Sequence, residues 1–125
     1  MMKHDVFLSC VLLAGLAGVL AVLPAERQAR ADFADAVEAY DGGDYATALI
    51  ESLKAARRGE VDAQYLAGFL YMRGEGTRRD FVRAYRWFTL AARQGDRFAA
   101  DELLSLAKRM SAAQISQAED EIPSD

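Results

Sequence analysis

The chain has 125 residues with 15 basic and 19 acidic side chains, which gives a formal net charge of −4 at pH 7. This length suits one domain, and the acidic balance argues against a nucleic-acid-binding protein. The one cysteine, Cys10, and the one histidine, His4, lie near the N-terminus. The rest of the sequence therefore offers no disulfide, no thiolate or histidine catalyst and no cysteine or histidine zinc ligand. We expect no enzymatic activity, no cofactor and no metal ion.

An uncharged apolar segment covers residues 6–23. It is followed by Ala29-Arg30-Ala31, which fits the small-x-small pattern of a signal-peptidase site. We therefore predict that residues 1–31 are a signal peptide, removed before Asp32, and that the protein is secreted or periplasmic. The alternative is an uncleaved membrane anchor, because residues 6–23 are just long enough to span a bilayer. The domain that follows would then also lie outside the cytoplasm.

After residue 31 the sequence is rich in alanine and leucine, and glycines divide it into segments of helical length. No segment alternates like a strand, so the predicted fold class is all-α. Ser111 and Gln114 form a predicted capping box that begins a last helix, ending near Ala118. Residues 119–125 are predicted to be a disordered acidic tail. The other expected helices lie near 32–41, 44–58, 61–73, 80–94 and 97–109.

Two of the expected helical pairs share residues that lie 36 positions apart, and such a period with paired helices predicts an α-solenoid. The recurring positions are Asp44, Ala48, Ala55, Ala56, Gly59 and Ala63, which return as Asp80, Ala84, Ala91, Ala92, Gly95 and Ala99.

The segment "DAQYLAGFLYMRGEGTRRDFVRAYRWFTLAARQGDRFAA" resembles a Sel1-like repeat, a branch of the tetratricopeptide-like solenoids. Thr77 and the Leu66-Ala67 order depart from the pattern of that family, which affects local packing only. The matching positions are Ala63, Gly68, Tyr71, Gly74, Gly76, Asp80, Ala84, Trp87, Ala91, Ala92, Gly95 and Ala99.

The resemblance implies a short α/α solenoid of about two helical hairpins with C-terminal capping helices, in a domain that covers residues 32–118. Residues 32–61 would form a degenerate hairpin, 62–97 the best repeat and 97–118 the capping helices. The family also implies the role of an adaptor or scaffold that binds another protein.

The Gly74-Glu75-Gly76 turn has two interpretations. A phosphate-binding loop needs a preceding strand and further glycines, or a lysine with a serine or threonine, whereas a helix is expected before this turn. We therefore predict a structural turn, in which Gly74 ends one helix in a left-handed conformation and Asp80 caps the next.

The first candidate binding surface is a concave groove between the helices at 32–41 and 61–73. Tyr65, Phe69 and Met72 share one face at helical spacing, and they would bind a peptide or a helix of another protein. The alternative is that these side chains pack against the preceding hairpin. The predicted groove residues are Glu38, Asp41, Tyr65, Phe69, Met72 and Arg73.

The second candidate is a basic surface on the helix near 80–94, within a region, residues 54–97, that carries ten basic and five acidic side chains. We expect Trp87 and Phe88 on the opposite, core-facing side, so that the arginines and the rings do not form one nucleic-acid-binding surface. The simplest interpretation is a solvated face, with an acidic partner or anionic lipid headgroups as the alternative. The arginines are Arg79, Arg83, Arg86 and Arg93.

These patterns together predict a non-catalytic, protein-binding adaptor or scaffold of the cell envelope. The alternative is a single-pass, membrane-anchored accessory subunit of a larger membrane complex, which would contact the membrane through residues 6–23. We expect no nucleic-acid partner in either case.

Overall fold

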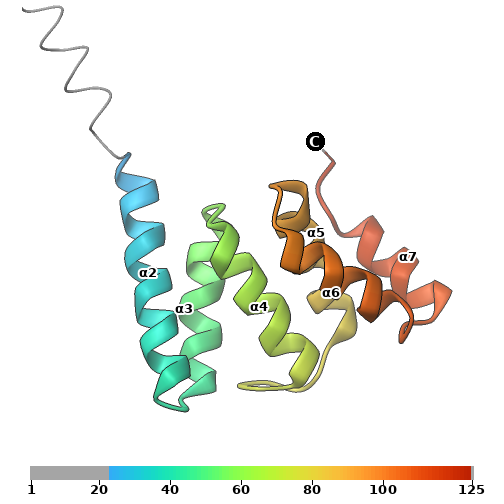
Figure 1. Ribbon diagram of the computed structural model, residues 1–125, viewed down its shortest axis with the longest axis horizontal. Helices are drawn as coiled ribbons and strands as arrows, with labels where there is room; N and C mark the ends of the chain where they lie inside the picture. Colours follow the sequence, from blue (N-terminus) through green and yellow to red (C-terminus); the bar gives the residue numbers. More distant parts are fainter. Residues whose placement is uncertain (1–22, 125) are drawn as a thin grey trace, which may run out of the picture.

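The structure, a computed structural model, describes residues 23–124 (Figure 1). Cys10, His4, residues 1–22 of the predicted signal peptide and all of the apolar run except Leu23 lie outside the described residues. The described part of the chain is all-α, as predicted, and contains no strand. Its helices are α2 (Pro24–Asp41), α3 (Tyr45–Arg57), α4 (Val61–Arg73), α5 (Phe81–Arg93), α6 (Arg97–Ala107) and α7 (Ala112–Asp120).

The helices stack as consecutive hairpins (Figure 1). Helix α2 packs against α3, and α4 packs against α5, each pair being joined by a short turn. Helix α3 also packs against α4, which joins the two hairpins, while α6 and α7 both pack on α5. This arrangement confirms a short solenoid-like fold with C-terminal helices that cover the last hairpin. Within residues 23–124, no helix is both long enough and apolar enough to cross a membrane.

The 36-residue period reappears as equivalent hydrogen bonds in the two hairpins. The carboxylate of Asp44 accepts from the backbone N–H three residues later, and that of Asp80 does the same. At the other end of each second helix, the N–H of Glu60 donates to Ala55 O at 3.2 Å, and the N–H of Asp96 donates to Ala91 O at 3.2 Å. The repeated residues therefore mark the beginnings and ends of the paired helices, where backbone groups need partners.

Close contact between α4 and α5 organises the core. Phe88 is fully buried, and a Cβ atom at Gly68 would lie only 2.8 Å from its ring. Glycine at position 68 therefore lets the aromatic ring of α5 rest directly on the backbone of α4. Trp87 is only half-buried and packs against small alanines of α3 and α4, such as Ala55 and Ala63. Phe88, more than Trp87, is thus the main buried aromatic side chain of this helix.

The turn between α4 and α5 is structural, as predicted. Gly74 ends α4 with φ 71°, in the left-handed region, and Asp80 caps α5. Gly76, with φ 78°, lies against the beginning of α3, because a Cβ atom there would be 2.6 Å from the carbonyl carbon of Tyr45. The turn of the second hairpin therefore contacts the first hairpin.

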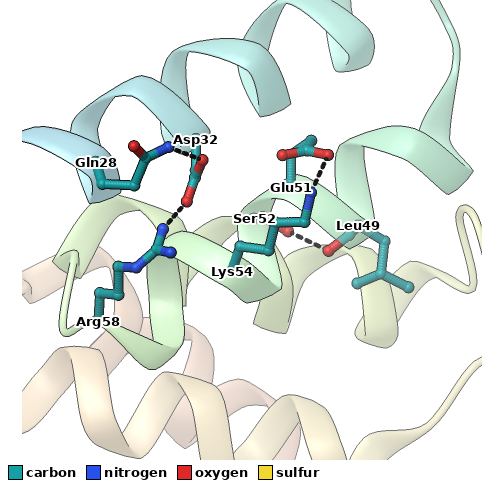
Figure 2. Close-up of polar contacts among 7 residues, drawn as sticks. All are labelled: Gln28, Asp32, Leu49, Glu51, Ser52, Lys54 and Arg58. Carbon is teal, nitrogen blue, oxygen red and sulfur yellow. Dashed lines mark hydrogen bonds and ion pairs between the residues drawn. The ribbon is translucent and has the colours of Figure 1, made fainter. Parts of the chain in front are cut away.

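Both ends of the domain extend beyond the ranges expected from the sequence. Helix α2 begins at Pro24 instead of near residue 32, and Ala29 is buried against the end of α3. Figure 2 shows that Asp32 receives hydrogen bonds from Gln28 of the same helix and from Arg58, at the C-terminal cap of α3. Proline at the first helical position and alanines nearby favour a helix there.

Helix α7 begins with the predicted capping box: Ser111 Oγ accepts from the N–H of Gln114, and Gln114 Oε1 accepts from the N–H of Ser111. The helix ends at Asp120, within the segment expected to be disordered. Glu119 and Glu121, also in that segment, contact α5 through Tyr85 and Arg86. These contacts give the acidic segment a defined position.

Candidate protein-binding surfaces

The first candidate surface is a hollow of about 280 Å³ between α2 and α4, which we call the α2–α4 groove. Its walls are mainly aromatic and aliphatic, and one carboxylate lies at its edge. Val37 is 38% exposed, so part of this apolar lining faces solvent. The lining residues are Phe33, Val37, Tyr40, Asp62, Tyr65 and Leu66.

One of the six predicted groove residues, Tyr65, lines this hollow. Phe69 stacks on Tyr65, with ring centroids 6.3 Å apart, and meets Tyr40 edge-on at 6.5 Å. The guanidinium of Arg73 lies over the Phe69 ring at 5.3 Å. Phe69 and Met72 are partly buried against the core, as the packing alternative proposed.

The two predicted acidic residues, Glu38 and Asp41, lie on α2, outside the lining of the groove. Other carboxylates act on this surface electrostatically. Burial raises the pKa of Tyr65, and the negative charges of Glu102 and Asp96 raise it further.

A second hollow, of about 410 Å³, adjoins the α2–α4 groove at Asp62, which lines both. It leads to the beginning of α6, where Phe98 is 75% exposed. The exposed Phe98 ring therefore adds apolar surface to the second hollow. Arg97 also lines this part.

Sequence reasoning missed five lining residues of the groove, which are Phe33, Val37, Tyr40, Asp62 and Leu66. A signal was present, because Phe33, Val37 and Tyr40 are spaced i, i+4 and i+7 and so share one face of α2. All three positions fall inside the helix expected near 32–41, but periodicity alone does not show which part of a helix face its neighbour leaves uncovered.

The second candidate surface differs from the predicted stripe. Arg79 precedes α5 and lies over the Phe81 ring at 4.9 Å, with Arg109 over the same ring at 4.7 Å. Arg83 and Arg86, in contrast, line a hollow between α3 and α5, which we call the α3–α5 groove. Its full lining is Leu53, Arg57, Tyr71, Arg83, Arg86, Trp87, Leu90 and Pro123.

The expectation that arginines and rings occupy opposite sides of α5 is therefore wrong for Trp87, which lines the same hollow as Arg83 and Arg86. Positions 83, 87 and 90 are four and three residues apart, which brings their side chains to one helix face. Arg93 is outside the lining of the α3–α5 groove but contacts its edge, since its Nη1 donates to the carbonyl of the lining residue Pro123 at 2.9 Å.

These surfaces have the chemistry of binding sites. Apolar hollows with charged edges bind complementary side chains, and hydrolytic or transfer chemistry would need a base or nucleophile aimed into a pocket. Among residues 23–124, no group of three or more acidic, histidine or cysteine side chains is arranged to hold a metal ion.

A stack of helical hairpins with partly exposed apolar hollows is the architecture of an α-solenoid interaction domain. The family model of the Sel1 repeat matches residues 61–96, which comprise α4, the turn and α5. The match supports the resemblance for this hairpin, and Sel1 repeats generally mediate binding between proteins in non-catalytic adaptors. Among curated proteins, none matches this chain.

Proposed function

We propose that the protein is a non-catalytic adaptor of the cell envelope that binds a segment of another protein in its α2–α4 groove. The observation that carries this proposal is the hollow itself, in which half-buried apolar side chains of two helices converge beside the exposed Val37. Such partly solvated aromatic and aliphatic groups gain most from being covered by a partner. The Sel1 repeat match independently favours a protein as the partner.

The charges around the groove select the kind of segment. Asp62 lines it, Asp96 lines the adjoining hollow, and the negative charges of Glu102 and Asp96 raise the pKa of Tyr65. A helix or peptide with an apolar side chain flanked by lysine or arginine complements this arrangement. The acidic groups would then speed association and fix orientation, while the apolar side chain supplies most of the affinity.

Val37→Glu tests this proposal, because position 37 is partly exposed and glutamate is compatible with a helix. The added carboxylate would face an apolar partner group, and we expect at least about a tenfold loss of affinity for the native partner. Ile50→Glu is the matched control, since Ile50 is a 55% exposed aliphatic residue on α3, outside this groove.

A photo-reactive phenylalanine analogue at position 37 should give a discrete cross-linked product in cells, and the same analogue at position 50 should not. Circular dichroism must show equal helicity for both glutamate variants. Equal partner binding by the two glutamate variants, or the same cross-link from both positions, would exclude the α2–α4 groove as the binding site.

A membrane-anchored accessory subunit is the second candidate, and the beginning of α2 favours it. Ala29 is 2% exposed, and Gln28 hydrogen-bonds to Asp32 at 2.9 Å. Cleavage after Ala31 would remove the first part of α2, including both Gln28 and Ala29. An uncleaved chain keeps the whole of α2, which begins at Pro24, directly after the apolar run.

The mass of the native protein distinguishes the two candidates. A chain that begins at Asp32 establishes the cleaved form, and one that begins at Met1 or Met2 establishes the anchored form. Ala31→Leu provides the control, because residue 31 is exposed on α2 and leucine disrupts the small-x-small pattern. This variant should accumulate as a longer precursor only if cleavage normally occurs there.

A further inference from the structure

The α3–α5 groove combines basic and apolar side chains in one hollow of about 440 Å³. Three arginines, Arg57, Arg83 and Arg86, are arranged around apolar groups that include Trp87 and Leu90. The guanidinium of Arg83 also lies over the Tyr71 ring at 5.6 Å. A ligand that fits this hollow carries negative charge and an apolar group on the same short segment.

The C-terminal segment of the chain, residues 119–123, has this composition and reaches the groove through Pro123. Arg86 Nη1 pairs with Glu121 Oε2 at 2.8 Å. The hydroxyl of Tyr85 donates to Glu119 Oε1 at 3.2 Å, and Pro123 contributes to the lining of the hollow itself. We call residues 119–123 the acidic strap.

The contacts of the strap are weak enough to be displaced. The Arg86–Glu121 pair is solvated, since its side chains are 34% and 44% exposed, and ion pairs of this kind contribute little to stability. The Nε of Arg86 is buried and has no hydrogen-bond partner in the described residues. Glu121 therefore engages Arg86 through Nη1 without using Nε, so the two-point pairing that makes arginine–carboxylate contacts strong is missing.

We propose that the α3–α5 groove is a second binding site, which takes an acidic segment of a partner protein, and that the acidic strap is its intramolecular competitor. Carboxylates of the partner pair with the arginines, and an apolar or proline side chain covers Trp87 and Leu90. The strap occupies the same edge until the partner displaces it. The apparent affinity is then reduced in proportion to the fraction of molecules in which the strap is bound.

The charge of the whole chain favours a peptide over a nucleic acid as the occupant. The net charge of −4 opposes approach of a polyanion, whereas a short peptide interacts with the local charges of the groove. The strap also shows which chemistry this face accepts: the Glu121 carboxylate pairs with Arg86, the Pro123 carbonyl accepts from Arg93 at the edge, and Pro123 itself lines the hollow.

The test uses the full chain and a fluorescent peptide of sequence SQAEDEIPSD, which copies residues 116–125. In Glu119→Gln/Glu121→Gln, the weakened strap should compete less, and the peptide should bind about threefold to tenfold more tightly by anisotropy at low salt. Asp35→Asn/Asp101→Asn is the matched control, because it removes the same charge from exposed positions elsewhere and should bind like the parent chain.

Arg86→Gln, in the background with the weakened strap, should return the affinity to the parent value or below. Arg57→Gln gives a second measure, since Arg57 is exposed on α3 and its replacement leaves α5 intact. Unchanged binding in both arginine variants would overturn the assigned site, and equal affinity of the parent and the strap variant would overturn the competition.

Two further probes test which chemical groups of a ligand the α3–α5 groove recognises. The neutral peptide SQAQNQIPSN should bind at least about tenfold more weakly, because it cannot pair with the arginines. A ten-residue oligothymidylate should fail to displace the acidic peptide, and displacement at lower concentration than unlabelled peptide would make this a nucleic-acid site instead. Val37→Glu should leave peptide binding unchanged, which keeps this test independent of the α2–α4 groove.

Discussion

Gly76→Ala should destabilise the domain far more than an ordinary glycine replacement, because two costs combine at this position. Gly76 has φ 78°, where a side chain costs about 1–2 kcal/mol. The new Cβ atom would also lie 2.6 Å from the carbonyl carbon of Tyr45 and 2.9 Å from the nitrogen of Ala46, and closer still to the Tyr45 oxygen. These neighbours are backbone atoms at the beginning of α3 and cannot rotate away.

Forcing an additional methyl group into such a contact costs about 1–3 kcal/mol. The expected total for Gly76→Ala is therefore about 2–5 kcal/mol, a large share of the stability of a domain of this size. Gly43→Ala is the matched control, since Gly43 has φ 79° but no atom lies within 4 Å of the place that a methyl group would take there. It carries the conformational cost alone, about 1–2 kcal/mol.

Urea denaturation followed by far-UV circular dichroism measures both variants on the same scale. The free energy of unfolding of Gly76→Ala should lie at least about 1 kcal/mol below that of Gly43→Ala. If the two variants lose the same stability, the turn does not rest on the beginning of α3, and the contact between the two hairpins is misassigned.

Two further predictions concern the core and a helix cap. Phe88→Ala should lower the free energy of unfolding by about 3–5 kcal/mol, because this ring is fully buried against Gly68. Trp87→Ala should lower it measurably less, because the Trp87 ring is half-buried. Equal losses of stability in urea denaturation would contradict this order. Hydrogen bonds from the side chain and then the backbone of Thr47 lower the pKa of Asp44. The Asp44 carboxylate therefore stabilises the folded state at pH values above its pKa in the unfolded chain. This contribution is lost as the pH falls through its lower pKa in the folded state. The difference in stability between the parent chain and Asp44→Asn should therefore shrink as the pH is lowered from neutral to below the ordinary carboxylate pKa of 3.8, and a constant difference would contradict the charged cap.

Local chemistry explains why most of the fold could be predicted from the sequence. Glycines in the left-handed region end helices, and Asp44, Asp80 and Ser111 cap them through bonds that span three residues. All these signals lie within a short window of sequence. The repeat supports the same helix boundaries a second time, because equivalent cap hydrogen bonds recur 36 residues apart.

The binding surfaces were harder to predict because they depend on how helices meet. Tyr65 was correctly assigned to an apolar face of α4, but the partner face on α2 begins with Phe33, next to the expected start of that helix. Phe69 shares the face of Tyr65 yet is covered by Tyr40 and Arg73. Helical spacing gives the direction of a side chain, and only the packing of the neighbouring helix decides whether that side chain is exposed.

The position of the acidic C-terminal segment could not be predicted from the sequence either, because it also depends on how distant helices pack. Its composition, judged alone, predicts a solvated chain, since it cannot bury enough apolar surface to order itself. Arg86 and Glu121 are separated by 35 positions, so no local window includes both groups. Their pairing depends on α7 returning along α5, a consequence of tertiary packing. A charged tail beside a basic helix face is therefore best treated as a candidate ligand of that face. The affinity of the strap variants for an acidic peptide measures how strongly the acidic strap competes for the α3–α5 groove.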